Sequence, residues 1–574
     1  MKPAIKSICV LSAALLLLAG CQKKESSLQD RLNQAASNTS SAESSEVSGT
    51  ESSQDPSTDP SSEPSSKPAD NGGKGTSSLK GGSKNGKDTG GKETGGPVEI
   101  ISLASGSYFD YSLIDADTEL FARIYGEYAL VGDDSLEQYP QLQKSLLSLG
   151  EQRQEGRREI YEQVLSYAKE DVANGTISPD GYFVTEYFCT RRADTRVTSL
   201  LMYGEYATGG VHNYPYYAAC TFDTQTGKLL ELSDVVTDVS VLPELVQQQL
   251  DNTTGTEYLY ENADLEYYFE EYKDSLNWTL DYYGLTIYFN PYEIAPYASG
   301  MPVAVLTFEE YPDLVREEYR EVPESYCIDF PNERSFYYDL DGDGKLDDIY
   351  TSGSYEMLDN NEYYFPSQYV YINGEMLTVE STTNGIYPTL VHMADGRNYL
   401  YVGNENGIGY RWYELYDITG GTIKSLGTFY AYPPHFYESE TRQLLTDPEH
   451  FTLETITYLL GSVYGADTYH VGSDGKPVKE SDWYWFDQTT KFTLLRPLTV
   501  TIVDEDGKEY GEETLPKGDT VIYYRTGYDD GTESIADLLL PDGRIGRVVV
   551  DTSNWYTIDG VMIEDIFDGL TYWD

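Results

Sequence analysis

The sequence predicts an α+β N-terminal domain, in which helices accompany an antiparallel sheet, followed by mostly-β domains, the last a small barrel. Three observations predict this fold class. Apolar residues recur at helical spacing in one long segment, 135–173, with Ile160, Val164 and Ala168 along one face. Short runs rich in tyrosine and β-branched residues surround that segment and fill the chain after it. In residues 492–574 such runs recur every ~8–12 residues, with glycine turns between them.

Length and charge limit the number of domains and the kinds of partner. A chain of 574 residues is too long for one hydrophobic core and should divide into several domains. Its 39 Lys and Arg stand against 96 Asp and Glu, which gives a net charge of −57. Such a charge repels phosphate backbones and anionic lipids, so we exclude nucleic acid as a partner and favour cations and basic proteins. The alternative is that the charge only keeps an exported protein soluble.

The N-terminus has the pattern of a secretion signal followed by a lipid anchor. Lys2 and Lys6 precede a short apolar run, 8–18, which is too short to remain as a membrane-spanning helix. The tripeptide Leu-Ala-Gly before Cys21 resembles the lipobox of bacterial lipoproteins. This resemblance implies that residues 1–20 are removed and that Cys21 is lipidated, which places the protein on the extracellular face of the cell membrane. We expect this anchor to be the only membrane contact, and two acyl chains make it stable.

Residues 21–97 are rich in Ser, Gly and Pro and have almost no apolar side chains. Such a segment cannot bury enough surface to fold, so we expect a disordered tether. As a flexible coil its ends would lie about 45–50 Å apart on average. A tether of this reach suits a domain presented within or beyond a thick cell wall, which favours a Gram-positive source.

Three folded regions are expected after the tether. Residues 98–323 form the α+β domain, and the long helix in it contains Gly156, which could divide it in two. Residues 324–491 form a β-rich domain with one helical insertion expected at 452–460. Residues 492–574 form a small β-barrel with an apolar helical tail. Within it, Leu-Pro-Lys-Gly-Asp at 515–519 and Asp-Gly-Arg-Ile-Gly at 542–546 resemble a bacterial SH3-like barrel.

The α+β region also resembles a known extracellular domain. The matching elements are Gly209-Gly210 with His212, the hairpin turn 223–227 between two β-runs, Leu232 with Asp234, and Tyr-Glu-Ile-Ala-Pro-Tyr at 292–297 with Gly300. They are similar to the extracellular domain of RsiV-type anti-sigma factors, which also accompanies some peptidoglycan deacetylases. The resemblance covers roughly residues 99–315 and implies a ligand-binding module. In the anti-sigma factors the ligand is lysozyme, and in the deacetylases the domain is non-catalytic and accompanies wall binding.

The chain departs from both settings of that domain. It has no segment that resembles a sigma-binding region and no membrane-spanning helix, so anti-sigma signalling is not expected. It also lacks the metal-dependent deacetylase domain, so that activity is not carried over. The function that the resemblance still implies for this chain is that of a ligand-binding module.

The resemblance raises the question of what role His212 has. A general base needs a partner and a nucleophile or water within reach, and only Glu205 lies close to His212 in the sequence. The alternative is a structural histidine that donates a hydrogen bond to a backbone carbonyl beside the glycine pair. We therefore expect no catalytic residue here, and we take His212, Tyr214 and Tyr216 as candidate ligand-binding residues.

The sharpest chemical motif is Asp-Leu-Asp-Gly-Asp-Gly-Lys-Leu-Asp-Asp at 339–348. It matches the spacing of a calcium-binding loop, because alternate carboxylates converge on one point when glycine lets the chain turn. The candidate ligands are four of the five carboxylates of the loop and one main-chain carbonyl: Asp339, Asp341, Asp343, Asp347 and, through its carbonyl, Lys345. Asp348 is a further candidate to complete the shell. Tyr350 replaces the glutamate that closes an EF-hand, and the flanks are strand-like. We therefore expect a structural Ca²⁺ between strands, with a solvated acidic hairpin as the alternative.

The remaining cysteines and the overall function leave alternatives open. Cys189, Cys220 and Cys327 are compatible with one disulfide or with buried thiols, and no pairing is assigned. The favoured function is a lipid-anchored extracellular binding protein that recognises lysozyme or another basic protein, or cell-wall glycan. The alternatives are a hydrolase acting on wall glycan through a pair of carboxylates, and a structural surface lipoprotein without a small ligand.

Overall fold

The computed structural model describes residues 97–572, except 117–119, 179–180, 211, 254–258, 261–262, 274, 358–362, 407–410, 434, 437–440, 528–532 and 554. The expected signal peptide, the lipidation site Cys21 and the tether lie outside the described residues. The described part of the chain forms one compact unit. It is mostly β, as expected, with five sheets and one long helix.

The first sheet carries the N-terminal half of the α+β region. Its seven strands lie in the order β18-β19-β1-β2-β3-β4-β5. They are β1 (Leu103–Asp115), β2 (Leu120–Val131), β3 (Tyr182–Ala193), β4 (Val197–Thr208), β5 (Tyr214–Asp223), β18 (His435–Phe436) and β19 (Thr441–Gln443). Strands β18 and β19 come from the second expected region, so the two regions share a sheet. All neighbours are antiparallel except β2 and β3, which are parallel.

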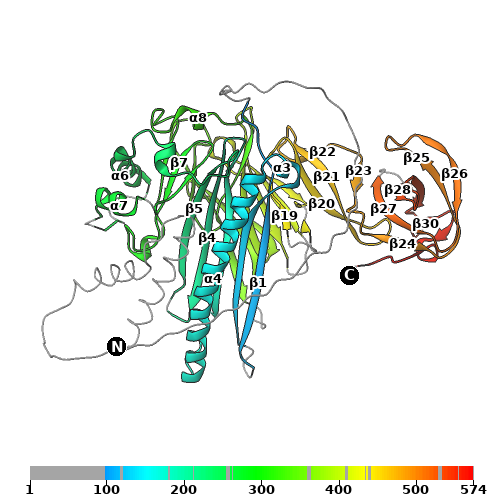
Figure 1. Ribbon diagram of the computed structural model, residues 1–574, viewed down its shortest axis with the longest axis horizontal. Coiled ribbons are helices and arrows are strands. Elements are labelled where there is room, and N and C mark those ends of the chain that lie inside the picture. Colours follow the sequence, from blue (N-terminus) through cyan, green and yellow to red (C-terminus); the bar gives the residue numbers. More distant parts are fainter. Residues whose placement is uncertain are drawn as a thin grey trace, which may run out of the picture. The chain divides into compact units, whose positions relative to one another are not determined.

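The long helix α4 (Pro140–Asn174) connects the two parallel strands, which need such a crossover. The short helix α3 (Asp133–Leu136) precedes it, and Pro140 stands at the first turn of α4, where proline is tolerated. Its buried stripe includes Ile160, Val164 and Ala168, which pack on the sheet as the periodicity predicts. Figure 1 shows α4 running along the sheet. The helix continues unbroken through Gly156, so the possible division at that glycine is wrong.

A smaller subdomain follows β5. The predicted turn after β5 is confirmed, because the Gly227 amide donates to the Asp223 carbonyl at 2.8 Å. The second β-run expected after it is only an isolated bridge between Phe222 and Leu229. Beyond it, helices and a three-stranded antiparallel sheet enclose one apolar core that includes Val246, Phe269 and Ile287. The elements are α5 (Leu232–Val235), η1 (Val239–Val241), α6 (Leu242–Thr253), α7 (Leu265–Tyr272), β6 (Asn277–Leu280), β7 (Gly284–Tyr288), η3 (Tyr297–Ser299), β8 (Val303–Thr307) and α8 (Glu317–Arg320).

Two antiparallel sheets make up most of the middle of the chain. The four-stranded sheet contains β10 (Phe336–Tyr338), β11 (Asp347–Met357), β12 (Tyr363–Ile372) and β13 (Glu375–Thr383). The five-stranded sheet contains β9 (Tyr326–Asp329), β14 (Gly385–His392), β15 (Asn398–Glu405), β16 (Arg411–Asp417) and β17 (Lys424–Phe429), with the short helix η4 (Thr419–Gly421) between its last two strands. Their apolar faces share one core that includes Ile349, Val370 and Leu400.

The last sheet has thirteen strands and spans the end of the second region and all of the third. Its main path is β20 (Phe451–Thr457), β21 (Val463–Val471), β23 (Trp483–Trp485), β27 (Thr520–Gly527), β28 (Glu533–Leu539), β29 (Ile545–Asp551), β25 (Leu498–Val503) and β26 (Glu509–Leu515). Strands off this path are β22 (Pro477–Lys479), β24 (Lys491–Leu494), β30 (Thr557–Ile558), β31 (Val561–Met562) and β32 (Phe567–Asp568). All named pairings in this sheet are antiparallel.

Two local expectations in this part of the chain are wrong. Residues 452–460 do not form a helix, because 451–457 is strand β20, whose buried Phe451 and Leu453 alternate with less buried neighbours. The C-terminal tail is not an apolar helix either. It forms short strand pairs and one turn of 3₁₀-helix, η5 (Ile563–Asp565), and buries Ile563, Ile566 and Phe567 in a core that also contains Leu459 and Phe486.

Candidate functional site

Four aromatic side chains from distant parts of the chain gather at the start of β5. We call His212, Tyr214, Tyr292 and Tyr297 the His212 cluster. The His212 ring stacks on Tyr297, with centroids 4.0 Å apart, and lies 5.2 Å from the ring of Tyr214. Tyr292 lies 6.1 Å from Tyr297 and is 50% exposed. The sequence analysis named His212 and Tyr214, and the structure adds two tyrosines of the 292–297 motif to them.

Hydrogen bonds fix the orientation of His212. Its Nδ1 lies 2.7 Å from the carbonyl oxygen of Asn213. Because a carbonyl only accepts, Nδ1 carries the hydrogen and donates, which leaves Nε2 as an acceptor in the neutral ring. The Tyr297 hydroxyl donates to the same carbonyl at 3.1 Å. This is the structural role considered from the sequence, although the carbonyl belongs to Asn213.

Glu205 is hydrogen-bonded to Asn213, whose side-chain amide donates to its carboxylate at 3.4 Å. Burial raises the pKa of Glu205 above its usual value, while the hydrogen bond from Asn213 opposes that shift. Asn213 thus holds the carboxylate that sequence reasoning considered as a partner for His212. The arrangement is a packed aromatic surface with an acidic residue at its edge.

Tyr214 and Tyr216 have different environments although they share one face of β5. Tyr214 is half-buried at the end of the strand and stacks on Tyr206, with ring centroids 5.1 Å apart. Tyr216 is buried, and its hydroxyl donates to Glu186 at 2.9 Å. Tyr216 therefore lies beneath the surface and is not available to a ligand in this structure, whereas Tyr214 is.

A buried ion network lies below Tyr216 and fixes β3 to α4. The guanidinium groups of Arg153 and Arg157 both pair with the carboxylate of Glu186, and all three side chains are buried. Burial favours a raised pKa for Glu186, but the two arginines hold its pKa below the usual value. Gly126 provides the space, since a Cβ there would come within 2.3 Å of the Arg157 guanidinium. The network is structural and supports the sheet that carries the His212 cluster.

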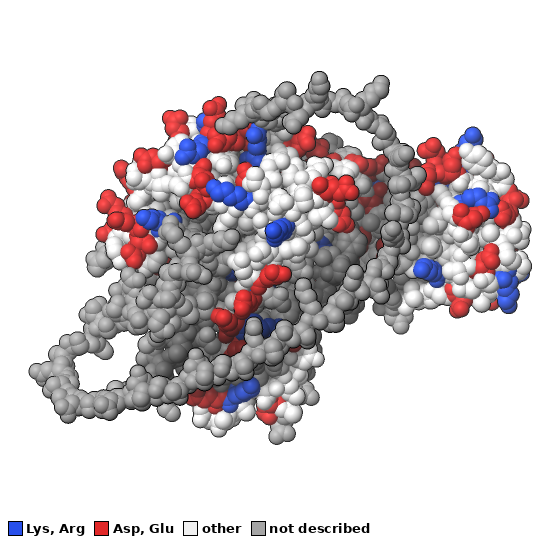
Figure 2. All heavy atoms as spheres, viewed as in Figure 1, with Lys and Arg blue, Asp and Glu red and all other residues white. Residues whose placement is uncertain are grey.

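Helix α7 extends the exposed surface beyond the His212 cluster. It presents to solvent two tyrosines, Tyr267 and Tyr272, and three glutamates, Glu266, Glu270 and Glu271. Figure 2 shows acidic side chains gathered over α6 and α7, with fewer basic ones among them. We call the five exposed residues of this helix, Glu266, Tyr267, Glu270, Glu271 and Tyr272, the α7 face. Tyrosine and glutamate occur throughout this chain, so no sequence signal singled the α7 face out.

Glu293 connects the α7 face to the His212 cluster. Its carboxylate accepts a hydrogen bond from the backbone amide of Asn290 at 2.7 Å and forms another with the Tyr268 hydroxyl of α7. Burial raises the pKa of Glu293 to about 7. Its neighbour Tyr292 has a left-handed backbone with a φ of 71°, which turns the Tyr292 ring outward next to Tyr297. The two parts of the surface therefore share one supporting residue.

The predicted Asp-rich loop connects β10 to β11. Carboxylate oxygens of Asp339, Asp341 and Asp347 lie within 4.8 Å of one another. Asp339 accepts the amides of Gly342 and Gly344 at 2.7 and 2.9 Å, and both glycines have left-handed φ values. The glycines are thus needed for the turn, as the motif implies.

Asp343 and Lys345 take a different arrangement from the three gathered aspartates. The Lys345 amide and ammonium both donate to Asp343 at 2.8 Å, so this carboxylate is paired within the loop. Asp347 accepts the Leu340 amide at 2.8 Å and the Asn373 side-chain amide at 2.6 Å. A set of three converging carboxylates fits a hard divalent cation that prefers oxygen ligands.

Two further observations concern the cysteines and the membrane. Cys189 and Cys327 are buried free thiols, and burial raises the pKa of both. Among the described residues, no helix is both long enough and apolar enough to cross a bilayer.

Part of this surface lies in a segment that is similar to a known family. Residues 233–309 match the sequence model of DUF3298, described as a protein of unknown function. This segment contains α7, Glu293 and two rings of the His212 cluster. No curated protein matches the chain.

Solved structures give three similarities at low identity. A DUF3298 family member from Bacteroides fragilis is 18% identical, with a TM-score of 0.30, and the match covers 38% of this chain and 96% of that one. A DUF3298 family protein from Pseudomonas aeruginosa is 15% identical, with a TM-score of 0.24, over 40% and 97%. Lysostaphin from Staphylococcus simulans is 11% identical, with a TM-score of 0.11, over 40% and 95%. The family model alone gives the extent of the similarity, which is residues 233–309.

Proposed function

We propose that this chain is a lipid-anchored binding protein of the bacterial cell envelope. It recognises a basic protein such as lysozyme through the His212 cluster and the α7 face. The observation that carries the proposal is the composition of this surface: exposed tyrosine rings stand beside the glutamates of α7. Tyrosine is enriched in protein interfaces, where its ring packs and its hydroxyl forms hydrogen bonds.

Charge supports a cationic partner. The chain has a net charge of −57, and the solvent-exposed side of α7 carries three glutamates, with Lys273 just after its last residue. A negative field speeds the approach of a positively charged protein at low salt, and this advantage falls as salt screens it. The resemblance of residues 99–315 to RsiV-type domains supports the same choice of partner.

The anchor and the ion belong to the same proposal. Lipidation at Cys21 would hold the protein on the extracellular face of the membrane, and the segment 21–97 would extend it from that face. A Ca²⁺ ion held by Asp339, Asp341 and Asp347 would neutralise carboxylates that otherwise repel one another. Its role is structural, since the loop joins two adjacent strands, β10 and β11.

The test is a binding experiment with two ligands. The full chain is incubated with lysozyme and, separately, with purified peptidoglycan, at low and at moderate salt. Binding of lysozyme that weakens with salt supports the proposal. Binding to peptidoglycan alone would identify a glycan-binding protein instead, and loss of turbidity in a wall suspension would identify a hydrolase. No interaction with either ligand, together with stabilisation by Ca²⁺, would leave a structural surface protein.

A further inference from the structure

A cavity of about 570 Å³ lies where three sheets meet, away from the residues discussed so far. Its walls come from β13 of the four-stranded sheet, β16 and β17 of the five-stranded sheet, and β20 and β21 of the thirteen-stranded sheet. We call it the three-sheet pocket. Its volume lies within the range of pockets that enclose small ligands. All of its lining residues lie between 380 and 464, outside the segment that matches DUF3298.

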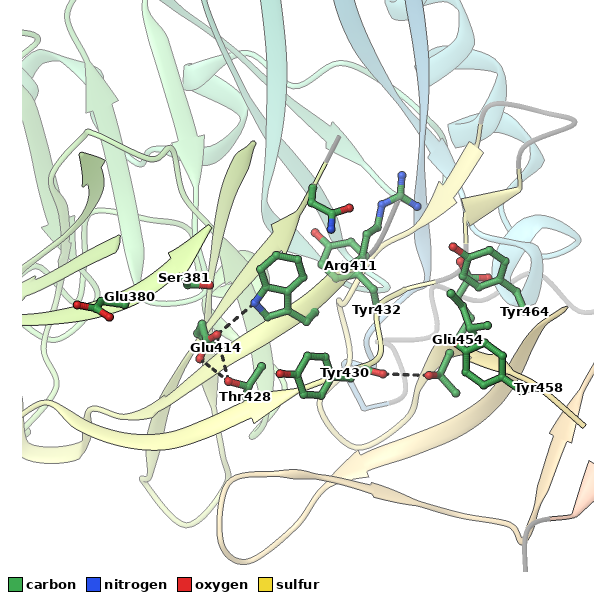
Figure 3. A pocket seen from close by; sticks show the side chains of 14 residues that line it. Glu380, Ser381, Arg411, Glu414, Thr428, Tyr430, Tyr432, Glu454, Tyr458 and Tyr464 are labelled. Carbon is green, nitrogen blue, oxygen red and sulfur yellow. Dashed lines mark hydrogen bonds between the residues drawn. The ribbon is translucent and has the colours of Figure 1, made fainter. Parts of the chain in front are cut away.

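Aromatic rings form much of the pocket wall. They are Trp412, Tyr430, Tyr432, Tyr458 and Tyr464. Tyr430 is 75% exposed, so its ring is open to a ligand, and Tyr458 is 45% exposed. Figure 3 shows Tyr430 near the middle of the pocket, with Glu414 on one side and Tyr458 on the other. Exposed apolar surface gathered around a hollow often marks a binding site.

Acidic side chains stand between these rings. The described lining contains three carboxylates, Glu380, Glu414 and Glu454. Figure 3 shows Glu414 and Glu454 at opposite ends of the pocket. The single cationic side chain in the described lining, Arg411, donates from Nε to Glu405 at 3.1 Å, and Figure 3 shows its guanidinium pointing away from Glu414. Acidic side chains therefore outnumber basic ones three to one in the described lining.

Glu414 also holds the tryptophan in place. The Trp412 indole nitrogen donates to Glu414 Oε1 at 3.1 Å, and the Thr428 hydroxyl lies 3.2 and 3.0 Å from its two carboxylate oxygens. Burial raises the pKa of Glu414 above its usual value, and these hydrogen bonds oppose the shift. The ring and the carboxylate are thus fixed relative to each other before a ligand arrives, which lowers the entropy cost of binding.

Ligand classes can be compared against this lining. Anions are repelled by three carboxylates. A neutral sugar offers hydroxyl groups that need donors as well as acceptors, whereas an ionised carboxylate only accepts. An ammonium ion needs no donor from the protein, and it gains both from the faces of aromatic rings and from nearby negative charge. The lining therefore suits an organic cation best.

We propose that the three-sheet pocket binds an organic ammonium ion, either a free small molecule or the side chain of a partner. The cation lies against the faces of Trp412 and Tyr430, with Glu414 and Glu454 as counter-charges. This is a second binding site, which does not depend on the surface assigned to the proposed function. It gives the chain a recognition element outside residues 233–309, the segment that matches the family model.

The experiment is isothermal titration calorimetry on the full chain with four probes. Choline represents a quaternary ammonium, a lysine-containing tripeptide represents a side-chain ammonium, 3,3-dimethylbutanol is the neutral counterpart of choline, and cellobiose is a neutral sugar. We expect choline or the tripeptide to bind with a dissociation constant below about 1 mM, and the neutral counterpart to bind at least ~10-fold more weakly. Equal binding of choline and its neutral counterpart, binding of cellobiose alone, or no binding of any probe overturns the proposal.

Variants assign the binding to this pocket. Tyr430→Ala removes a side chain that is 75% exposed, so the fold should be kept, and Glu414→Gln removes a charge without changing shape. Each should weaken binding of the ammonium probe by about 3- to 30-fold. Trp555→Ala is the matched control, because Trp555 is 80% exposed and does not line the pocket. Tyr297→Ala should leave ammonium binding unchanged, which separates this site from the His212 cluster. Unchanged affinity in both pocket variants would contradict the proposal.

Discussion

The imidazole of His212 stacks on the ring of Tyr297, with centroids 4.0 Å apart and planes inclined by 24°. One residue precedes β5 of the large sheet, and the other begins η3 of the smaller subdomain. The contact therefore joins the two substructures at the surface that we assign to binding. Both side chains also interact with the Asn213 carbonyl, which fixes their positions.

Tyr297→Ala should weaken lysozyme binding without unfolding the protein. The change removes one face of the His212 stack and a ring of the exposed cluster, and aromatic residues at the centre of an interface often contribute about 2 kcal/mol or more. We expect the dissociation constant to rise at least ~10-fold, measured by biolayer interferometry at low salt. Tyr430→Ala, which alters the three-sheet pocket, is the control and should bind lysozyme as the wild type does. Equal affinity of the two variants would show that the His212 cluster is only packing.

Glu293 should make the subdomain less stable as pH rises. Because burial raises its pKa to about 7 in the folded state, the native protein binds this proton more tightly than the unfolded chain. The stabilisation is complete below about pH 4.5 and is lost as pH rises through about 7. Glu293→Gln mimics the protonated form and keeps an acceptor for the Asn290 amide.

Denaturant unfolding of wild type and Glu293→Gln at pH 4.5, 6 and 8 measures this effect. The two proteins should be equally stable at pH 4.5, and the variant should be more stable at pH 8 by up to about 3 kcal/mol. The difference in the free energy of unfolding between the two proteins excludes the contribution of the other carboxylates, because these titrate in both. A constant difference across the three pH values would show that Glu293 has an ordinary pKa.

The parts of the fold that were predicted correctly are those set by local pattern. The stripe containing Ile160 and Val164 specifies α4, and the glycines of the Asp-rich loop specify its turn. Residues 452–460 were misassigned because a short run that mixes β-branched and apolar residues fits either a helix or a strand, and its partner β21 decides between them. Periodicity contains no information about that partner.

For the candidate sites too, local motifs could be predicted from the sequence, whereas contacts between distant residues could not. The Asp-rich loop is contiguous, so sequence spacing revealed it. The His212 cluster was half found, because Tyr292 and Tyr297 approach His212 only in the folded chain. Tyr216 was included because it is near His212 in sequence, but it lies further along β5, beneath the surface, where its hydroxyl donates to buried Glu186. The three-sheet pocket draws its walls from three sheets, and no local motif encodes such an arrangement.

Glu186→Gln should strongly destabilise the large sheet. The substitution leaves Arg153 and Arg157 buried without a counter-charge, and breaking a buried pair in this way costs about 3–5 kcal/mol. Denaturant unfolding measures it. Asp542→Asn is the matched control, since its partner Arg544 is exposed and the change should scarcely affect stability. A small loss in the Glu186 variant would show that water or a neighbouring group replaces the carboxylate.

Cys21→Ala should release the protein from the membrane. If lipidation at this residue is the only anchor, the variant loses its acyl chains. Burial of these chains in the bilayer provides the membrane affinity. Cells expressing the variant should yield the protein in the medium or wall fraction, whereas the wild type sediments with membranes and incorporates labelled fatty acid. Cys9→Ala is the control and should behave as the wild type. Membrane retention of the Cys21 variant would indicate another anchor.

Calcium should raise the melting temperature of the full chain. Asp339, Asp341 and Asp347 bring oxygens within 4.8 Å of one another, and a divalent cation removes their mutual repulsion. For an extracellular site with a dissociation constant near 1 mM, 10 mM Ca²⁺ would add about 1.4 kcal/mol, or a few degrees in melting temperature. Differential scanning fluorimetry with Ca²⁺, Mg²⁺ and chelator measures this shift.

Asp341→Asn tests whether the shift arises in this loop. Asn keeps the acceptor for the Asp343 amide, which Asp341 accepts at 3.0 Å, so the turn should survive while one charge is lost. The variant should lose most of the response to Ca²⁺, whereas Asp395→Asn, in the hairpin between β14 and β15, should keep it. Mg²⁺ should act more weakly than Ca²⁺, because it demands a tighter octahedral shell than a flexible loop provides. An equal response in both variants, or to both ions, would mean that Ca²⁺ stabilises the chain by screening its many carboxylates and not by binding at 339–347.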